Sequence, residues 1–154
     1  MKIVVLRHGD AIYSNSDRVL SSTGMKEASS TGEKLSKYVK FTKCFCSPKT
    51  RAKQTAQIVL TQNNCDCKIE ILSDLTPSGD PSQVISYIEA TCSKDDTVLL
   101  VSHLPLVWTL SYDFNKNLLM PPQFDTACAL IMEHDGLRAK YQCFLAPNKD
   151  DYLF

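Results

Sequence analysis

The chain has 154 residues, the usual length of one domain whose buried core needs no metal ion or disulfide for stability. Basic and acidic residues number 17 each, so no overall charge favours nucleic acid or an anionic membrane as a partner. Any anion-binding site must therefore be a local cluster. We predict a single domain over residues 1–154, with 148–154 as a C-terminal tail.

The first apolar run is too short for an export signal or a membrane anchor. It covers Ile3–Leu6 and stops at Arg7, whereas a signal peptide needs about 7–15 apolar residues and a membrane helix about 20. The seven cysteines are odd in number, and several lie within apolar runs such as Cys44-Phe45-Cys46. These features predict reduced thiols and a cytoplasmic location.

Apolar runs and helical spacing predict alternating strands and helices. In chain order these are strand Ile3–Leu6, a helix from Ser22 to about Val39, strand Cys44–Cys46, a helix from Thr50 to about Leu60, strand Ile69–Leu72, a helix from Pro81, strand Val98–Val101, helix Leu106–Tyr112, and strands Ala127–Met132 and Ala139–Leu145. Continuous apolar strands are typical of a sheet covered on both faces. The alternation predicts a three-layer α/β/α sandwich with a mostly parallel sheet.

Polar residues gather just after three of these strands, where ligands bind in open α/β sheets. They are Arg7, His8 and Gly9 after the first strand, Ser47 and Arg51 after the second, and Ser102 and His103 after the fourth. Two histidines and two arginines, far apart in the sequence, are thus expected on one rim. This convergence is the main functional signal in the chain.

Two guanidiniums and two imidazoles at one point suit a phosphoryl group. Arg7 and Arg51 can each hold two phosphate oxygens, and a neutral imidazole such as that of His8 is a competent nucleophile toward phosphorus. If protonated, His103 adds another donor. The chain has neither a Walker-type glycine loop nor a carboxylate cluster, so we expect phosphoryl chemistry without a metal or other cofactor.

Each of these residues also has an ordinary structural interpretation. Taken alone, His103 can be a hydrogen-bonded strand-end residue, Arg7 a surface cation, and Arg51 a solvated helix residue. His134 has no matching partner and is interpreted as structural. The joint placement of all four strand-end residues favours a site.

The cysteines offer an alternative site. Cys44-x-Cys46 and Cys65-x-Cys67 together supply four potential zinc ligands, but structural zinc pairs usually have two to four residues between the cysteines. We also expect Cys44 and Cys46 to point to opposite faces of their strand. No metal site is therefore predicted.

Three motifs carry a family resemblance: Leu6-Arg7-His8-Gly9-Asp10-Ala11, Ser47–Ala56 with Arg51 at its centre, and Val101-Ser102-His103-Leu104-Pro105. In this order they resemble the histidine phosphatase superfamily, which includes the cofactor-dependent phosphoglycerate mutases. Within it the chain is most similar to the bacterial phosphohistidine phosphatases. The resemblance extends over about residues 1–132.

The resemblance implies a phosphoglycerate mutase-like fold and a phosphorylated nucleophile at His8. It implies that Arg7, Arg51 and His103 hold the phosphoryl group, and that Gly9 lets the backbone pass close by. Ser14 or Asn15 is a further contact that it suggests. The implied partners are phosphate and a phosphohistidine-bearing protein, either a histidine-phosphotransfer domain or a phosphocarrier of two-component signalling.

One departure from the family pattern bears on the substrate. Many relatives carry an acidic proton donor after the third strand, where this chain has Thr76 and Pro77. An imidazole leaving group has a pKa near 6.5 and leaves without a strong acid, whereas an alkoxide needs a proton. The sequence thus favours phosphohistidine. The alternatives are a small-molecule phosphomonoesterase, with Asp80 or Asp10 as acid, and a non-catalytic phosphoprotein-binding module.

Overall fold

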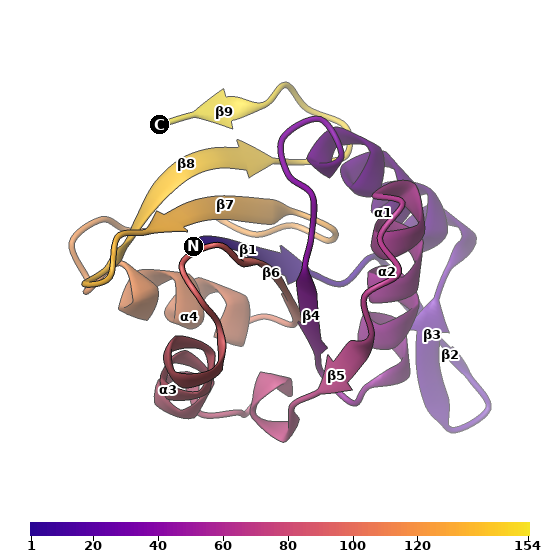
Figure 1. The fold of residues 1–154 in the computed structure, drawn as a ribbon. Helices are drawn as coiled ribbons and strands as arrows, with labels where there is room; N and C mark the ends of the chain where they lie inside the picture. Colours follow the sequence, from indigo (N-terminus) through magenta and orange to yellow (C-terminus); the bar gives the residue numbers. More distant parts are fainter.

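A seven-stranded sheet forms the centre of the protein in the computed structural model, which describes residues 1–154 (Figure 1). Its strands are β1 (Lys2–Arg7), β4 (Lys43–Cys46), β5 (Ile69–Ile71), β6 (Thr97–Ser102), β7 (Ala129–His134), β8 (Ala139–Leu145) and β9 (Tyr152–Leu153). They lie in the order β5-β4-β6-β1-β7-β8-β9. The first four of this order run parallel, and the last three pair antiparallel. The predicted α/β class and largely parallel sheet are confirmed.

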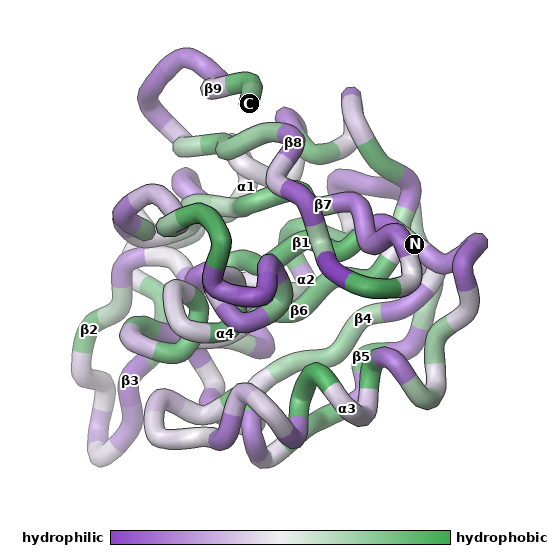
Figure 2. Tube along the Cα trace, turned by 90° about the vertical axis from the view of Figure 1, so that its left-hand side faces the viewer, coloured by the Kyte–Doolittle hydropathy of each residue, from purple (hydrophilic) through white to green (hydrophobic).

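Helices cover both faces of the sheet. They are α1 (Ser22–Leu35), α2 (Thr50–Gln62), α3 (Pro81–Thr91) and α4 (Leu106–Phe114). Strand β1 alternates between two cores: Val4 and Leu6 pack with α1 and α2, whereas Ile3 and Val5 pack with α3 and α4. Apolar residues accordingly follow the central strands in Figure 2. No helix has the length and apolar character needed to cross a membrane.

Local side chains explain where helices begin and end. Ser21 caps α1 by accepting a hydrogen bond from the Gly24 amide at 3.0 Å. The helix ends at Leu35, four residues before the predicted end at Val39, because Ser36 Oγ donates to the Glu33 carbonyl at 2.6 Å and competes with helical bonding. Pro81 occupies the first turn of α3 as predicted.

The structure contains two features that the sequence did not predict, and one sequence expectation is wrong. A hairpin, β2 (Ala11–Ser14) and β3 (Asp17–Leu20), follows β1 in a stretch for which no strand was predicted. The tail 148–154 contains β9, which pairs with β8, and Phe154 packs edge-to-face against Tyr141 of β8. Cys44 and Cys46 lie on the same face of β4, since residues two apart in a strand share a face.

Gly24 allows α1 to touch the loop after β1. A Cβ at this position would lie 2.0 Å from the Asp10 carbonyl oxygen. We expect Gly24→Ala to lower the free energy of unfolding by about 3 kcal/mol, because both contacting segments are backbone and must move apart. Urea unfolding measures the loss. Thr23→Ala, at an exposed position of the same turn, is the matched control, and equal stability of the two variants would contradict the close approach.

Candidate active site

The carboxyl ends of β1, β4 and β6 bring the predicted residues together. Arg7 of β1 is in register with Ser102 of β6. The His8 amide donates to the Ser102 carbonyl at 3.1 Å, and the Ser47 amide donates to the Val101 carbonyl at 3.0 Å. The three segments that follow these strands therefore leave the sheet side by side, as expected from a parallel arrangement.

His8 is held with one ring nitrogen available. The residue is only 4% exposed; Nδ1 lies 2.7 Å from the Gly9 carbonyl, and Arg51 Nε donates to Nε2 at 3.3 Å. Because a carbonyl accepts only, Nδ1 carries the proton and Nε2 keeps its lone pair. Burial lowers the pKa of His8; the hydrogen bond to Gly9 opposes this shift and the charges of Arg51 and Arg7 add to it, which gives a pKa of about 4. At neutral pH the His8 imidazole is therefore uncharged.

His103 packs against His8. The two ring centroids lie 4.9 Å apart, and Nε2 of His103 hydrogen-bonds with Ser47 Oγ at 2.8 Å. Its other nitrogen, Nδ1, is buried without a partner. Burial and then the neighbouring His8 lower the pKa of His103 to about 3. The free site thus keeps His103 neutral, so its protonation requires an anion beside it.

Two arginines flank the imidazoles. Arg51 sits in the first turn of α2 and is mostly buried. Arg7 Nη1 donates to the Phe124 carbonyl at 2.9 Å, which fixes the guanidinium, while its Nε is buried without a partner. Burial lowers the pKa of both arginines, yet an arginine stays protonated in a protein. Both remain cations beside the neutral histidines.

Gly9 connects His8 to its surroundings. Its amide donates to Thr55 Oγ1 at 3.1 Å, and that hydroxyl donates to the Arg51 carbonyl at 2.8 Å. A Cβ on Gly9 would lie 2.6 Å from the carbonyl oxygen of Gly24. The glycine is therefore needed for close backbone packing behind His8, in line with the expected role.

Sequence reasoning missed Arg18 on β3. Its positive charge contributes to lowering the pKa of His8, His103, Arg7 and Arg51. The adjacent Asp17 accepts a hydrogen bond from Thr50 at 2.6 Å, which ties the hairpin to the start of α2. No motif marked this arginine; the hairpin that delivers it was not predicted. Of the two suggested contacts, Ser14 is the last residue of β2 and Asn15 lies in the turn of the hairpin, and both are exposed.

The main charges that act on both histidines are basic. The pKa of His8 is lowered by Arg51, Arg7 and Arg18, and the pKa of His103 by His8 and by basic side chains that include Arg51. Asp10 Oδ2 accepts from Ser21 at 2.6 Å, and exposed Asp80 caps α3 through Ser82. Thr76 donates its hydroxyl to the Ser73 carbonyl. Both acids considered from the sequence thus have structural partners.

The buried neutral histidines make stability depend on pH. The unfolded chain takes up protons near pH 6.5 and the folded chain only near pH 3 to 4, so between these values the unfolded state binds more protons and stability falls as pH falls. From pH 8 to pH 5 each histidine accounts for about 2 kcal/mol of this loss. We expect the loss of unfolding free energy between pH 8 and pH 5, measured by urea unfolding, to be smaller in His103→Gln by the contribution of this one histidine. An equal loss in the variant and the wild type would contradict the prediction.

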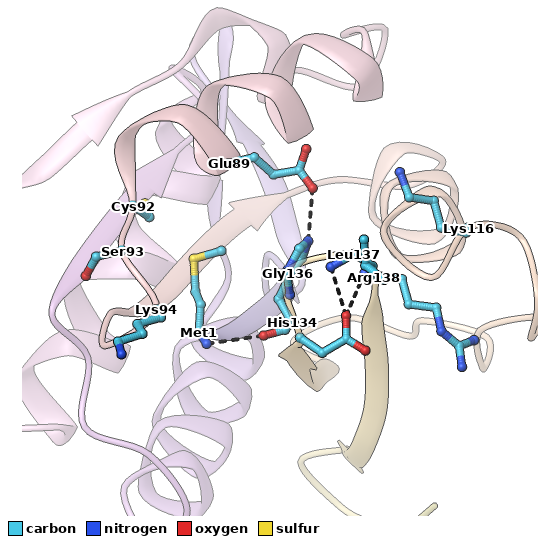
Figure 3. A pocket seen from close by; sticks show the side chains of 11 residues that line it. Met1, Glu89, Cys92, Ser93, Lys94, Lys116, His134, Gly136, Leu137 and Arg138 are labelled. Atoms are coloured by element: carbon cyan, nitrogen blue, oxygen red, sulfur yellow. Dashed lines mark hydrogen bonds and ion pairs between the residues drawn. The ribbon is translucent and has the colours of Figure 1, made fainter.

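A large pocket lies at the amino end of β1, the opposite end of the strand from His8 (Figure 3). Its volume is about 820 Å³, and it is lined by the amino end of β1, the segment after α3 and the β7–β8 turn. His134 lies there, 8% exposed, with Nε2 bonded to Glu89 at 2.9 Å. His134 is therefore remote from the strand ends that carry His8, as its structural interpretation predicted.

Comparisons with known proteins agree with this geometry. Residues 3–76 match the family model described as histidine phosphatase superfamily (branch 1). The chain is 34% identical over 132 residues to phosphohistidine phosphatase SixA of Escherichia coli, covering 82% of this chain and 81% of that protein. It is 35% identical over 121 residues to a SixA homolog of Haemophilus influenzae, covering 70% and 73%.

A solved structure of the protein histidine phosphatase SixA complexed with tungstate superimposes with a TM-score of 0.85 at 30% identity, covering 96% of this chain and 97% of that one. The match therefore extends over the whole sheet and its helices, beyond the segment of the family model. Together with the arginine–histidine pair at the end of β1, it shows that the chain belongs to branch 1 of the histidine phosphatase superfamily.

Proposed function

We propose that the protein is a phosphohistidine phosphatase, which removes phosphate from a phosphohistidine on a partner protein through a phospho-His8 intermediate. One observation carries the proposal: Arg7 Nε and His103 Nδ1 are the only buried side-chain nitrogens without a hydrogen-bond partner. Both belong to the cluster around His8. A phosphoryl group in front of Nε2 offers oxygens to satisfy both nitrogens.

In the first step, the lone pair on His8 Nε2 attacks phosphorus. A P–N bond forms to His8 while the P–N bond of the substrate breaks, and the electron pair of the broken bond stays on the leaving nitrogen. The other ring nitrogen of the substrate carries a proton, so that a neutral imidazole leaves. The Gly9 carbonyl keeps the proton on Nδ1 and orients the ring. Arg7, Arg51 and His103 hold the phosphoryl oxygens and stabilise their charge.

In the second step, water attacks phosphorus from the opposite side, the bond to Nε2 breaks, and orthophosphate leaves. Neither step needs a strong acid, because both leaving groups are imidazoles with a pKa far below that of an alcohol. The charge of Asp17 raises the pKa of Arg51. Asp17 does not act as the proton donor, because hydrogen bonds from Thr50 and the Arg18 amide lower its own pKa. The chain has Thr76 and Pro77 where many relatives carry an acidic proton donor, and this departure favours phosphohistidine over phosphate esters.

The relatives support the substrate class, since the Escherichia coli protein is named a phosphohistidine phosphatase. A histidine-phosphotransfer domain or a phosphocarrier protein of cytoplasmic two-component signalling is the partner we infer.

A panel of substrates tests the proposal. We expect kcat/KM on a phosphohistidine-containing phosphotransfer protein to exceed that on phosphoserine peptides and sugar phosphates, with one phosphate released per phosphohistidine. Faster hydrolysis of the esters would instead assign a small-molecule phosphomonoesterase. Binding of the phosphoprotein without phosphate release would assign a non-catalytic binding module.

A further inference from the structure

Cys65 and Cys67 form a close thiol pair between α2 and β5, outside the phosphatase site. Their sulfur atoms lie 2.8 Å apart, and both residues are half-buried while Asp66 between them is exposed. This alternation is that of extended chain, in which side chains two residues apart lie on the same face. The backbone therefore directs both thiols to the same place.

We propose that Cys65 and Cys67 are a site of reversible oxidation, at which a hydroperoxide converts the two thiols into a disulfide within the loop. The sulfurs need to approach by about 0.8 Å to reach bonding distance. Two residues of extended chain span about 6.6 Å, which falls within the Cα separation that disulfides allow. Closure thus requires only local adjustment.

The surroundings give the two sulfurs different roles. Cys65 Sγ accepts a hydrogen bond from the Cys67 amide at 3.3 Å, and its thiol donates to the Phe41 carbonyl at 3.3 Å. Burial and the bond to Cys65 raise the pKa of Cys67 to about 12, so Cys67 stays a thiol. We therefore assign the first attack to Cys65 and the role of resolving thiol to Cys67.

The reaction balances in two steps. Cys65 attacks the hydroperoxide, the O–O bond breaks, and the products are a sulfenic acid on Cys65 and an alcohol. The Cys67 sulfur then attacks Cys65 Sγ, water leaves, and the disulfide forms. Overall the two thiols lose two electrons and two protons, which the hydroperoxide takes up.

Other outcomes at these thiols are less favoured by the structure. No cluster of three or more cysteine, histidine or acidic side chains has the geometry to hold a metal ion. The nearby Cys44 and Cys46 are buried, and burial raises the pKa of both thiols, which makes them poor nucleophiles. Oxidation is thus expected at the half-buried Cys65 and Cys67 rather than at the buried Cys44 and Cys46.

The pair is also separated from the phosphoryl site. It follows the last turn of α2, whereas Arg51 lies in the first turn, and the helix between them is about 18 Å long. Disulfide formation should therefore leave the phosphatase rate unchanged. This independence distinguishes the proposal from general oxidative damage, and from any failure of the proposed function.

Mass spectrometry of the folded protein tests the proposal. After brief exposure to hydrogen peroxide, we expect intact protein to lose two hydrogen atoms, peptides to place the bond between Cys65 and Cys67, and dithiothreitol to reverse it. Cys65→Ser and Cys67→Ser should each prevent the loss, and Cys67→Ser should leave a sulfenic acid on Cys65. Cys92→Ser, which removes another half-buried thiol, is the matched control and should behave as the wild type.

Two results would overturn it. One is a loss of two hydrogen atoms that persists in Cys65→Ser. The other is a wild-type protein in which Cys92 is oxidised while Cys65 and Cys67 both remain reactive toward an alkylating agent. Both readouts are independent of phosphatase activity.

Discussion

Replacing His8 with alanine is expected to lower kcat by a factor on the order of 10⁴–10⁶, the loss typical of removing a covalent nucleophile. The reason is the orientation of one nitrogen: Nδ1 is engaged by Gly9, and Nε2 alone faces the charges of Arg51 and Arg7. His103 does not replace it, because its Nε2 is bonded to Ser47.

Rapid quenching measures the intermediate directly. With a radiolabelled phosphohistidine protein as substrate, wild-type protein should carry an acid-labile, base-stable label on His8, and His8→Ala should carry none. The control is His134→Gln, which removes a buried histidine at the opposite end of the strands from His8. This variant should keep both the wild-type turnover and the radiolabel on His8. A His8→Ala variant that folds and still turns over would refute the mechanism.

The second large effect is expected at Arg51. Arg51→Ala should lower kcat/KM by roughly 10²–10³, as when a donor to a developing charge is removed from a preorganised site. Arg51→Lys should recover part of the loss, because lysine keeps the charge but has neither the planar fork nor an Nε–H toward His8.

A second measurement separates this role from a structural one. The positive charge of Arg51 lowers the pKa of His8, so Arg51→Ala should raise that pKa in an NMR titration of the imidazole. Lys53→Ala, at an exposed position on the same helix, should change neither kcat/KM nor the pKa. Equal losses in the two variants would argue against contact between Arg51 and the phosphoryl group.

Several elements were predictable because their signals are local. The apolar runs of β1, β4 and β6 and the helical spacing of α2 are strong periodic patterns, and the observed bounds differ from the predicted ones by one or two residues. Parallel strands place their carboxyl ends on one edge. The meeting of His8, Arg51 and His103 therefore followed from the strand assignments.

Other elements were not predictable because distant contacts form them. β2 and β3 pair with each other and rest on α2, and only that packing brings Arg18 to the site. β9 is short and exposed; its strand exists because β8 offers it an edge. The close approach of Cys65 and Cys67 was likewise not predictable, because the distance between their sulfur atoms depends on the path of the chain between α2 and β5.

The sequence by itself determined the class of fold and which side chains meet, since periodicity and strand ends are properties of neighbouring residues. Only the tertiary structure decided their chemical state. Burial lowers the pKa of His8 and His103. The buried nitrogens of Arg7 and His103 that lack a hydrogen-bond partner can be identified only from the hydrogen bonds of the folded chain. Desolvation and hydrogen-bond satisfaction depend on what surrounds a group in space, and residues far apart in the chain supply those surroundings.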